Sequence, residues 1–327
     1  MTNLEDHPDL QVCEAAAPAS PVEVMTPRDV PLGGPRAMLV SRTLPQRARS
    51  LIGAWCFLDY FGPDDVSATG GMQVARHPHT GLATVSWLFE GAIDHIDSAG
   101  NWAHIRAGDT DLMNAGTGIT HSEFSSADTT TLHGVQLWYA FPDRYRFTEP
   151  GLARHTPEPV RGDGYSAKVF VGTLLGDTSP IPTYIPLTGA ELHLDAGAEV
   201  ILDVPADHEH GVLAARGTVR LDDTAVPENH LGYVGTGRTQ LRLRAGDEPV
   251  LAVLIGGEPL GEQIIMWWNF VGRTSEEIAE WRERYQLEMG FGEGEPDGDL
   301  QFGDFPPGQP KPLPAPELPG TRLRPRG

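Results

Sequence analysis

The sequence has few of the residues that several protein classes require. It contains two cysteines, Cys13 and Cys56, in 327 residues, which is too few for a disulfide scaffold or a cysteine-ligated metal site. Basic residues are also scarce, with 24 Lys and Arg against 45 Asp and Glu and a formal net charge of −21. Because binding to nucleic acid phosphates needs clustered Lys and Arg, we expect no direct contact with DNA or RNA.

Long apolar runs and targeting signals are missing as well. No apolar run approaches the ~18 residues of a membrane-spanning helix, and the first ten residues, MTNLEDHPDL, are acidic and lack the apolar core of a secretory signal. The chain has no Ser-His-Asp grouping and no phosphate-binding loop, since GTGRTQ lacks the required Lys. We therefore expect a cytoplasmic protein without a membrane segment, and a monomer by default.

Glycine and proline, by contrast, are abundant. The 38 Gly and 29 Pro make up about a fifth of the chain, against an average of about 12%, and this favours a β protein with many turns. Short alternating runs with strand character, separated by the turn sequences DSAGN and NAGTG, fill the first half at residues 83–91, 92–97, 102–109, 120–126 and 132–141. A second set of such runs begins near Ala167.

The two halves share a rhythm of strand, turn and strand. FEGAIDH and IRAGD in the first half correspond to ARGTVRL and LRAGD in the second, which indicates an internal duplication. The sequence therefore predicts an all-β fold of two tandem antiparallel β-barrels. The expected parts are a flexible N-terminal tail, a first barrel, a second barrel with a helix, and a disordered Gly/Pro-rich tail, at residues 1–22, 23–160, 161–290 and 291–327.

One helix is predicted between the second barrel and the C-terminal tail. Thr274 is followed three residues later by Glu277, the pattern of a capping box, and Gly290 is suited to end the helix. The apolar residues recur roughly at helical spacing, at Ile278, Trp281, Tyr285 and Met289. This stripe predicts packing against a barrel and no chemistry.

Two short motifs carry the candidate chemistry. His77 and His79 lie in RHPHTG, and His121 and Glu123 lie in THSEF. Side chains two residues apart on a strand share one face, so two such pairs on neighbouring strands converge inside a small barrel. Either motif alone most often has no metal, but together they predict one mononuclear site with three imidazoles and one carboxylate. This set suits Fe²⁺ or Mn²⁺ and accepts Ni²⁺, Cu²⁺ or Zn²⁺.

The remaining histidines and aromatic residues are interpreted as structural. His208 and His210 also have H-x-H spacing but no H-x-E follows them, so we interpret them as a polar surface turn in a metal-free second barrel. His95 and His104 flank a hairpin and are expected to face solvent, whereas His133 is expected to make a structural hydrogen bond. Core packing is expected for three aromatic residues, Trp55, Phe57 and Trp138.

The longer segments around both motifs resemble the pirin family. GGMQVARHPHTGLATVSWLFEGAIDHIDSAGN resembles a first cupin motif, and AGDTDLMNAGTGITHSEF resembles a second, in the form specific to pirins. LHGVQLWYAFP and GGEPLGEQIIMWWNFVGRTSEEI follow in the family's order. The resemblance covers roughly residues 22 to 288 and implies a bicupin, two cupin-type barrels with one metal in the first.

The resemblance also implies a ligand set and a function. By position the metal ligands are His77, His79, His121 and Glu123, and the metal is iron, usually Fe²⁺. Some family members cleave the flavonol quercetin with O₂ as a quercetin 2,3-dioxygenase, and Glu123 would then accept the substrate proton. Others resemble redox-responsive regulatory proteins that act through protein partners. Both functions stay open here, as does the effect of Leu82-Ala83, where many pirins have a Glu.

Overall fold

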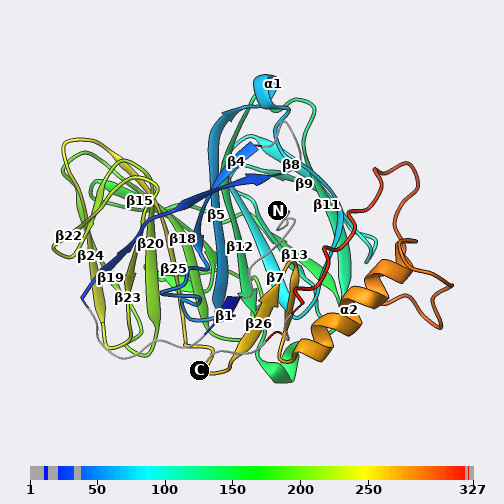
Figure 1. Cartoon of the computed structure of the whole chain (residues 1–327). Coiled ribbons are helices and arrows are strands. Elements are labelled where there is room, and N and C mark those ends of the chain that lie inside the picture. Colours follow the sequence, from blue (N-terminus) through cyan, green and yellow to red (C-terminus); the bar gives the residue numbers. More distant parts are fainter. Residues whose placement is uncertain (1–10, 14–20, 33–37, 321–322, 324–327) are drawn as a thin grey trace.

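Two antiparallel β-barrels stand side by side in the chain (Figure 1). The structure, a computed structural model, describes residues 11–13, 21–32, 38–320 and 323. Each barrel is built from one seven-stranded and one four-stranded sheet, so the predicted all-β fold of two tandem cupin-type barrels is confirmed. Neither helix in the described residues is long and apolar enough to cross a membrane.

The first barrel carries both sequence motifs. Its large sheet has the order β13-β10-β7-β12-β5-β4-β3. The strands of this sheet are β3 (Arg28–Leu32), β4 (Met38–Leu44), β5 (Trp55–Asp65), β7 (Leu82–Glu90), β10 (Thr110–Asn114), β12 (Thr131–Ala140) and β13 (Gly151–His155). The small sheet, in the order β6-β11-β8-β9, consists of β6 (Gln73–His79), β8 (Ala92–Asp97), β9 (Trp102–Arg106) and β11 (Ile119–Ser125). Two short helices belong to its connections, α1 (Val66–Thr69) and a 3₁₀ helix (Asp143–Tyr145).

The second barrel repeats this plan. Its large sheet, in the order β14-β15-β18-β25-β20-β23-β2, consists of β2 (Glu23–Met25), β14 (Val160–Gly162), β15 (Tyr165–Val171), β18 (Leu187–Leu194), β20 (Glu209–Arg216), β23 (Leu231–Val234) and β25 (Val250–Gly257). The small sheet, in the order β19-β24-β21-β22, consists of β19 (Glu199–Asp203), β21 (Val219–Leu221), β22 (Thr224–Val226) and β24 (Gln240–Ala245). A separate hairpin pairs β16 (Thr173–Leu174) with β17 (Asp177–Thr178).

The large sheets of the two barrels share one apolar core, which contains side chains from β5, β7 and β12 and from β18, β20 and β25. Trp87 crosses this interface, because its indole stacks on Phe170 with centroids 4.8 Å apart and its Nε1 donates to Glu191 at 2.7 Å. Tyr60 crosses it too and donates to the carbonyl of Ala215 at 2.7 Å. Burial of this apolar surface fixes the first barrel against the second.

Strands β2 and β3 are consecutive in the chain but belong to different barrels, since β2 pairs with β23 and β3 pairs with β4. A separate three-stranded sheet joins β1 (Gln11–Cys13) to the hairpin of β26 (Ile264–Trp267) and β27 (Phe270–Gly272). Cys13 therefore lies in a strand, not in the flexible segment expected for 1–22. Residues 1–10 and 14–20 of that expected tail lie outside the described residues.

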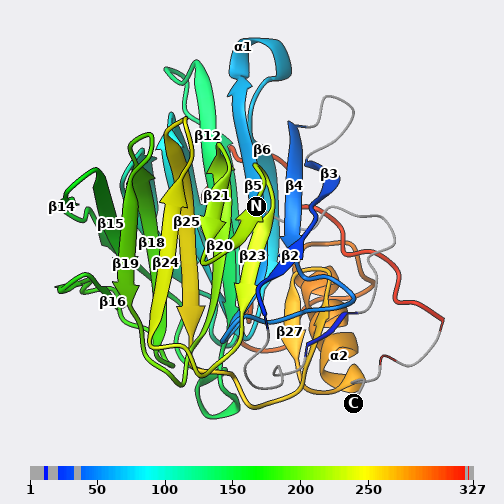
Figure 2. The same cartoon turned by 90° about the vertical axis from the view of Figure 1, so that its left-hand side faces the viewer.

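The predicted helix is confirmed as α2 (Ser275–Glu288). Thr274 accepts from the backbone N–H of Glu277, and the Glu277 side chain completes the capping box. The buried face consists of Ile278, Trp281 and Tyr285. The helix contacts β27, and Figures 1 and 2 show it beside the hairpin at the base of the first barrel.

The C-terminal tail contacts the protein at a few positions, although most of residues 291–320 are exposed. The expected disorder over 291–327 stays a prediction. Phe302 is fully buried and lies edge-on to Tyr285, with ring centroids 5.4 Å apart. Thr120 donates to the carbonyl of Phe302 at 3.0 Å, and Arg76 donates to that of Gly303 at 2.6 Å. These contacts hold the tail against the outer face of β6 and β11. They do not recur at a regular spacing in the sequence, so no periodic pattern predicted them.

The packed tail generates a stability prediction. Phe302→Ala should lower the free energy of unfolding by about 3 kcal/mol, because it removes a fully buried ring. The matched control is Phe291→Ala in the same tail, where the side chain is 42% exposed and the change should stay within about 0.5 kcal/mol. Urea unfolding of both variants measures the difference. Equal midpoints would show that the tail is not packed as described.

Candidate metal centre

The two motifs lie on adjacent antiparallel strands of the small sheet of the first barrel. His77 and His79 are on β6, and His121 and Glu123 are on β11. His121 pairs directly with His77, and Ile119 pairs with His79. The register shifts between His121 and Glu123, where an irregularity adds a residue on β6. This register brings His77, His79 and His121 together, whereas Glu123 lies in a second group of potential ligand atoms with His95 and His121.

Tight turns make this arrangement possible. Gly81, immediately after the first motif, has φ +68, and an added Cβ would lie 2.3 Å from the carbonyl oxygen of Val271. Gly116, before β11, has φ +48, and a Cβ there would lie 1.9 Å from the carbonyl oxygen of Thr148. Only glycine fits both the positive φ and the close approach. The glycines in HTG and AGTG therefore fix where the motif strands end and begin.

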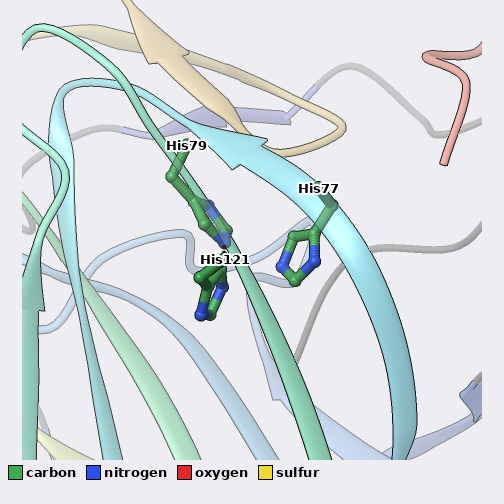
Figure 3. Close-up of side chains that lie close together, drawn as sticks. All are labelled: His77, His79 and His121. Atoms are coloured by element: carbon green, nitrogen blue, oxygen red, sulfur yellow. Dashed lines mark hydrogen bonds between the residues drawn. The ribbon is translucent and has the colours of Figure 1, made fainter. Parts of the chain in front are cut away.

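Three imidazoles converge in the barrel (Figure 3). His77, His79 and His121 are fully buried, and each offers one nitrogen within 4.8 Å of the other two. Nε2 of His79 lies 3.1 Å from Nε2 of His121. Nε2 of His77 has no hydrogen-bond partner among the described residues. The inner nitrogens of all three rings are thus directed at one another instead of at a protein donor or acceptor.

The outer nitrogens of the same rings each have a partner. Nδ1 of His77 lies 2.9 Å from the carbonyl oxygen of Ala75, and Nδ1 of His79 lies 3.2 Å from that of Asn269. A carbonyl oxygen only accepts, so both Nδ1 atoms carry the hydrogen. Nδ1 of His121 lies 3.4 Å from Nδ1 of His95. These bonds leave a lone pair on the Nε2 atoms of His77 and His79, which is the form of histidine that binds metal ions.

The surroundings keep these imidazoles uncharged. Burial lowers the pKa of His77 to about 3, and it lowers the pKa of His79 and His121 well below 6.5. The neighbouring imidazoles act in the same direction on the pKa of His79 and His121. At neutral pH the cluster therefore consists of neutral donors.

Glu123 is buried beside the histidines, where it contacts Ser86 from β7. Its Oε1 lies 3.2 Å from Ser86 Oγ, which also lies 2.9 Å from the side-chain amide of Gln136. A serine hydroxyl has a single hydrogen. If Ser86 donates it to Glu123, Gln136 faces Ser86 with its NH₂ group. Ser86 and Gln136 thus hold the carboxylate from the opposite sheet, and the sequence motifs did not indicate them.

His95 belongs to the same region, so the prediction that it faces solvent is wrong. Its side chain is 1% exposed and forms a second group of potential ligands with His121 and Glu123. Burial opposes charge on His95, but Asp97, Asp111 and Glu123 favour it, and its pKa is raised overall. The missed signal was the alternation along β8, in which Ile93, His95 and Asp97 all point inward. His104, on β9, is half-buried and pairs with Asp94 at 2.7 Å.

The H-x-H pair of the second barrel is buried, so the prediction of a polar surface turn is wrong. His210 is fully buried on β20, and His208 is 8% exposed. The ring centroids lie 6.1 Å apart, and neither residue belongs to a group of three potential metal ligands within the described part of the chain. Burial lowers the pKa of His210 to about 4.

Aromatic residues predicted to be core do pack there. Trp55, Phe57 and Trp138 are all buried. Phe57 stacks on Trp138 with centroids 4.0 Å apart, and Trp138 lies edge-on to His79 at 5.0 Å. Trp138 thus packs in the core and also contacts the candidate centre through His79. His133 makes the expected structural hydrogen bond, with Nε2 2.9 Å from the Tyr60 hydroxyl.

Comparison with known proteins places this geometry in context. Residues 37–139 match the pirin family, and residues 189–291 match the pirin C-terminal cupin domain. A Pseudomonas aeruginosa protein, provisionally named a quercetin 2,3-dioxygenase, is 36% identical over 90% of both chains. A pirin-like protein of Caulobacter vibrioides is 32% identical over 82% of this chain and 93% of that one. The crystal structure of a quercetin 2,3-dioxygenase from Acinetobacter baumannii covers 93% of this chain and 98% of its own, with 32% identity and a TM-score of 0.84.

The hydrogen bond of His133 generates a pH prediction. Burial lowers the pKa of His133 to about 4, whereas the unfolded chain takes up this proton near pH 6.5. Between pH 6.5 and 4 the unfolded state binds more protons, so the folded state loses stability as the pH falls. His133→Gln removes this effect, and the wild type should lose up to about 1.4 kcal/mol per pH unit more than the variant. Parallel stability curves in urea unfolding would contradict this.

Proposed function

The chain belongs to the pirin family, and from this premise we propose that it is a mononuclear metal-dependent dioxygenase of the quercetin 2,3-dioxygenase type. The proposed ligands are His77, His79, His121 and Glu123, and the proposed metal is iron as Fe²⁺. The observation that supports this most directly is the orientation of three neutral imidazoles, whose Nδ1 atoms are hydrogen-bonded outward while their Nε2 atoms converge.

The spacing of the inner nitrogens fits a metal ion. Two nitrogen ligands at roughly 2.1 Å from one ion and at a right angle to each other lie about 3.0 Å apart. Nε2 of His79 and Nε2 of His121 are 3.1 Å apart. If His121 carries its hydrogen on Nδ1, as His79 does, the two inner lone pairs face each other and repel. A bound cation removes that repulsion and also supplies the missing partner of His77 Nε2.

Glu123 is the natural fourth ligand. Its carboxylate lies with His121 in one group of potential ligand atoms and is 1% exposed. His95 lies in the same group, but its Nε2 is 3.2 Å from Asp97 and its Nδ1 faces His121. Both nitrogens of His95 thus already face a protein partner, which favours Glu123 as the fourth ligand. Three nitrogens and one oxygen suit Fe²⁺, and also accept Mn²⁺, Ni²⁺, Cu²⁺ or Zn²⁺.

The relatives named for quercetin cleavage suggest a planar flavonol as the substrate and O₂ as the second reactant. When bound, the metal supplies a Lewis acid that brings the flavonol hydroxyl and O₂ together. Glu123 accepts the hydroxyl proton, while Ser86 and Gln136 hold the carboxylate in place. The stacked rings of Phe57 and Trp138 give His79 an apolar side, which suits a flat aromatic ligand. Ring cleavage by O₂ would release CO and a depside.

The first prediction from this proposal concerns metal content. Protein purified without added metal should hold about one equivalent of iron, and His77→Gln should lose most of it because one of the few ligands is gone. His210→Gln is the matched control, since it removes a fully buried histidine of the same H-x-H spacing from the second barrel. Elemental analysis measures both. Equal iron in all three proteins would show that the ion is not at the proposed centre.

The second prediction concerns turnover. Iron-loaded wild type should consume quercetin and O₂, and Glu123→Gln should be roughly 10²–10⁴ times slower per bound iron because the proton acceptor is lost. His104→Gln, at a half-buried His–Asp pair on the same sheet, should match the wild type. Oxygen uptake and flavonol absorbance report the rates. Stoichiometric iron without any quercetin turnover would contradict the dioxygenase and leave the regulatory alternative.

A further inference from the structure

The outer hydrogen bonds of the three converging histidines are not equivalent. Two end on backbone carbonyls, of Ala75 for His77 and of Asn269 for His79. The third ends on a side chain, because Nδ1 of His121 faces Nδ1 of His95 at 3.4 Å. A backbone carbonyl has a fixed basicity, whereas a side-chain acceptor depends on what lies behind it. His121 is therefore the one proposed histidine ligand whose partner is a side chain and so can be tuned.

A buried carboxylate lies behind His95. Nε2 of His95 is 3.2 Å from Oδ2 of Asp97, and both side chains are buried. The Asp97 carboxylate is fixed from the other side by three donors of the following turn, the backbone N–H groups of Ala99 and Asn101 and the Asn101 side chain. The register of β11 with β8 places Asp97 opposite His121 and His95 opposite Glu123. The adjacent strands β11 and β8 thus place His121, His95 and Asp97 next to one another.

The direction of the hydrogens follows from the proposed ligation. If His121 binds the metal through Nε2, its Nδ1 carries a hydrogen and donates to Nδ1 of His95. In its neutral form, His95 then accepts on Nδ1, carries its own hydrogen on Nε2 and donates it to Asp97. A carboxylate at the end of such a chain pulls hydrogen toward itself and increases the electron density of the ligand imidazole.

We propose that His95 and Asp97 are positioning residues that set the orientation and donor strength of His121, and through it the affinity and reduction potential of the bound metal. This inference rests on the proposed metal centre. It predicts that loss of the acceptor at residue 95 weakens metal binding and favours the reduced ion, since a poorer donor stabilises the ferric state less. A residue with a merely structural role would change folding stability and leave the potential unaffected.

The test compares the wild type with His95→Leu, which has no acceptor, and His95→Gln, whose amide oxygen can still accept from His121. Anaerobic Fe²⁺ titration should show binding about 10–100-fold weaker in His95→Leu and largely restored in His95→Gln. The midpoint potential of the bound iron, measured by spectroelectrochemistry, should move to more positive values in the order wild type, His95→Gln, His95→Leu. His104→Gln is the matched control, because His104 also pairs with an aspartate, Asp94, on the same sheet, and it should leave both quantities unchanged.

The outcomes separate this inference from the proposed function. Equal affinity and equal potential in the wild type and both His95 variants would overturn the inference while leaving the metal centre in place. A wild type that binds no iron would overturn both. Iron binding that responds to His95 without quercetin turnover would support the inference and reject only the dioxygenase. Thermal unfolding of the metal-free proteins checks folding, and if His95→Leu does not fold, a wild-type potential in His95→Gln overturns the inference.

Discussion

The structure of the first barrel is organised around one constraint: three imidazoles must be buried without charge and with their inner nitrogens free. Each ring satisfies it by giving its outer hydrogen to an acceptor, and those acceptors come from three different places. Ala75 is on the same strand as His77, His95 is on the neighbouring strand β8, and Asn269 is in the β26–β27 turn. The bulge in β6, the turn at Gly81 and the docking of the hairpin all serve this requirement, because moving any of them would leave a ring nitrogen unpaired in the core.

The sequence was sufficient to predict the two barrels and the two ligand motifs, for a simple physical reason. Period-2 alternation and glycine turns are local signals, and a histidine two residues from another on a strand shares its face wherever the strand goes. What depends on contacts between distant segments was not predictable. The inward orientation of His95 depends on which face of β8 meets β11, and the alternation there contains as many polar as apolar residues. The burial of Phe302 depends on an apolar cluster that α2 and the β26–β27 hairpin form only after folding.

The second barrel shows that the fold and the site are separable. It has the same pairing of a seven-stranded and a four-stranded sheet, but its interior is an apolar cluster of valine, leucine and alanine. His210 occupies a buried position on β20 there, but among the described residues it belongs to no group of three potential metal ligands, and its ring centroid lies 6.1 Å from that of His208. Of the two similar barrels, the first therefore contains the candidate metal centre. The second has an apolar interior and packs against the first through its large sheet, where Trp87 of the first barrel donates to Glu191.

The bond from His79 to Asn269 has a consequence for the order of events during biosynthesis. All four proposed ligands precede residue 124, whereas the carbonyl that fixes the His79 ring belongs to residue 269. A nascent chain that has emerged only through its first barrel thus contains all four proposed ligands. It lacks the Asn269 carbonyl that orients the His79 ring. Under the proposed ligation, full-strength metal binding therefore requires that residue 269 has been translated and that the β26–β27 hairpin has docked.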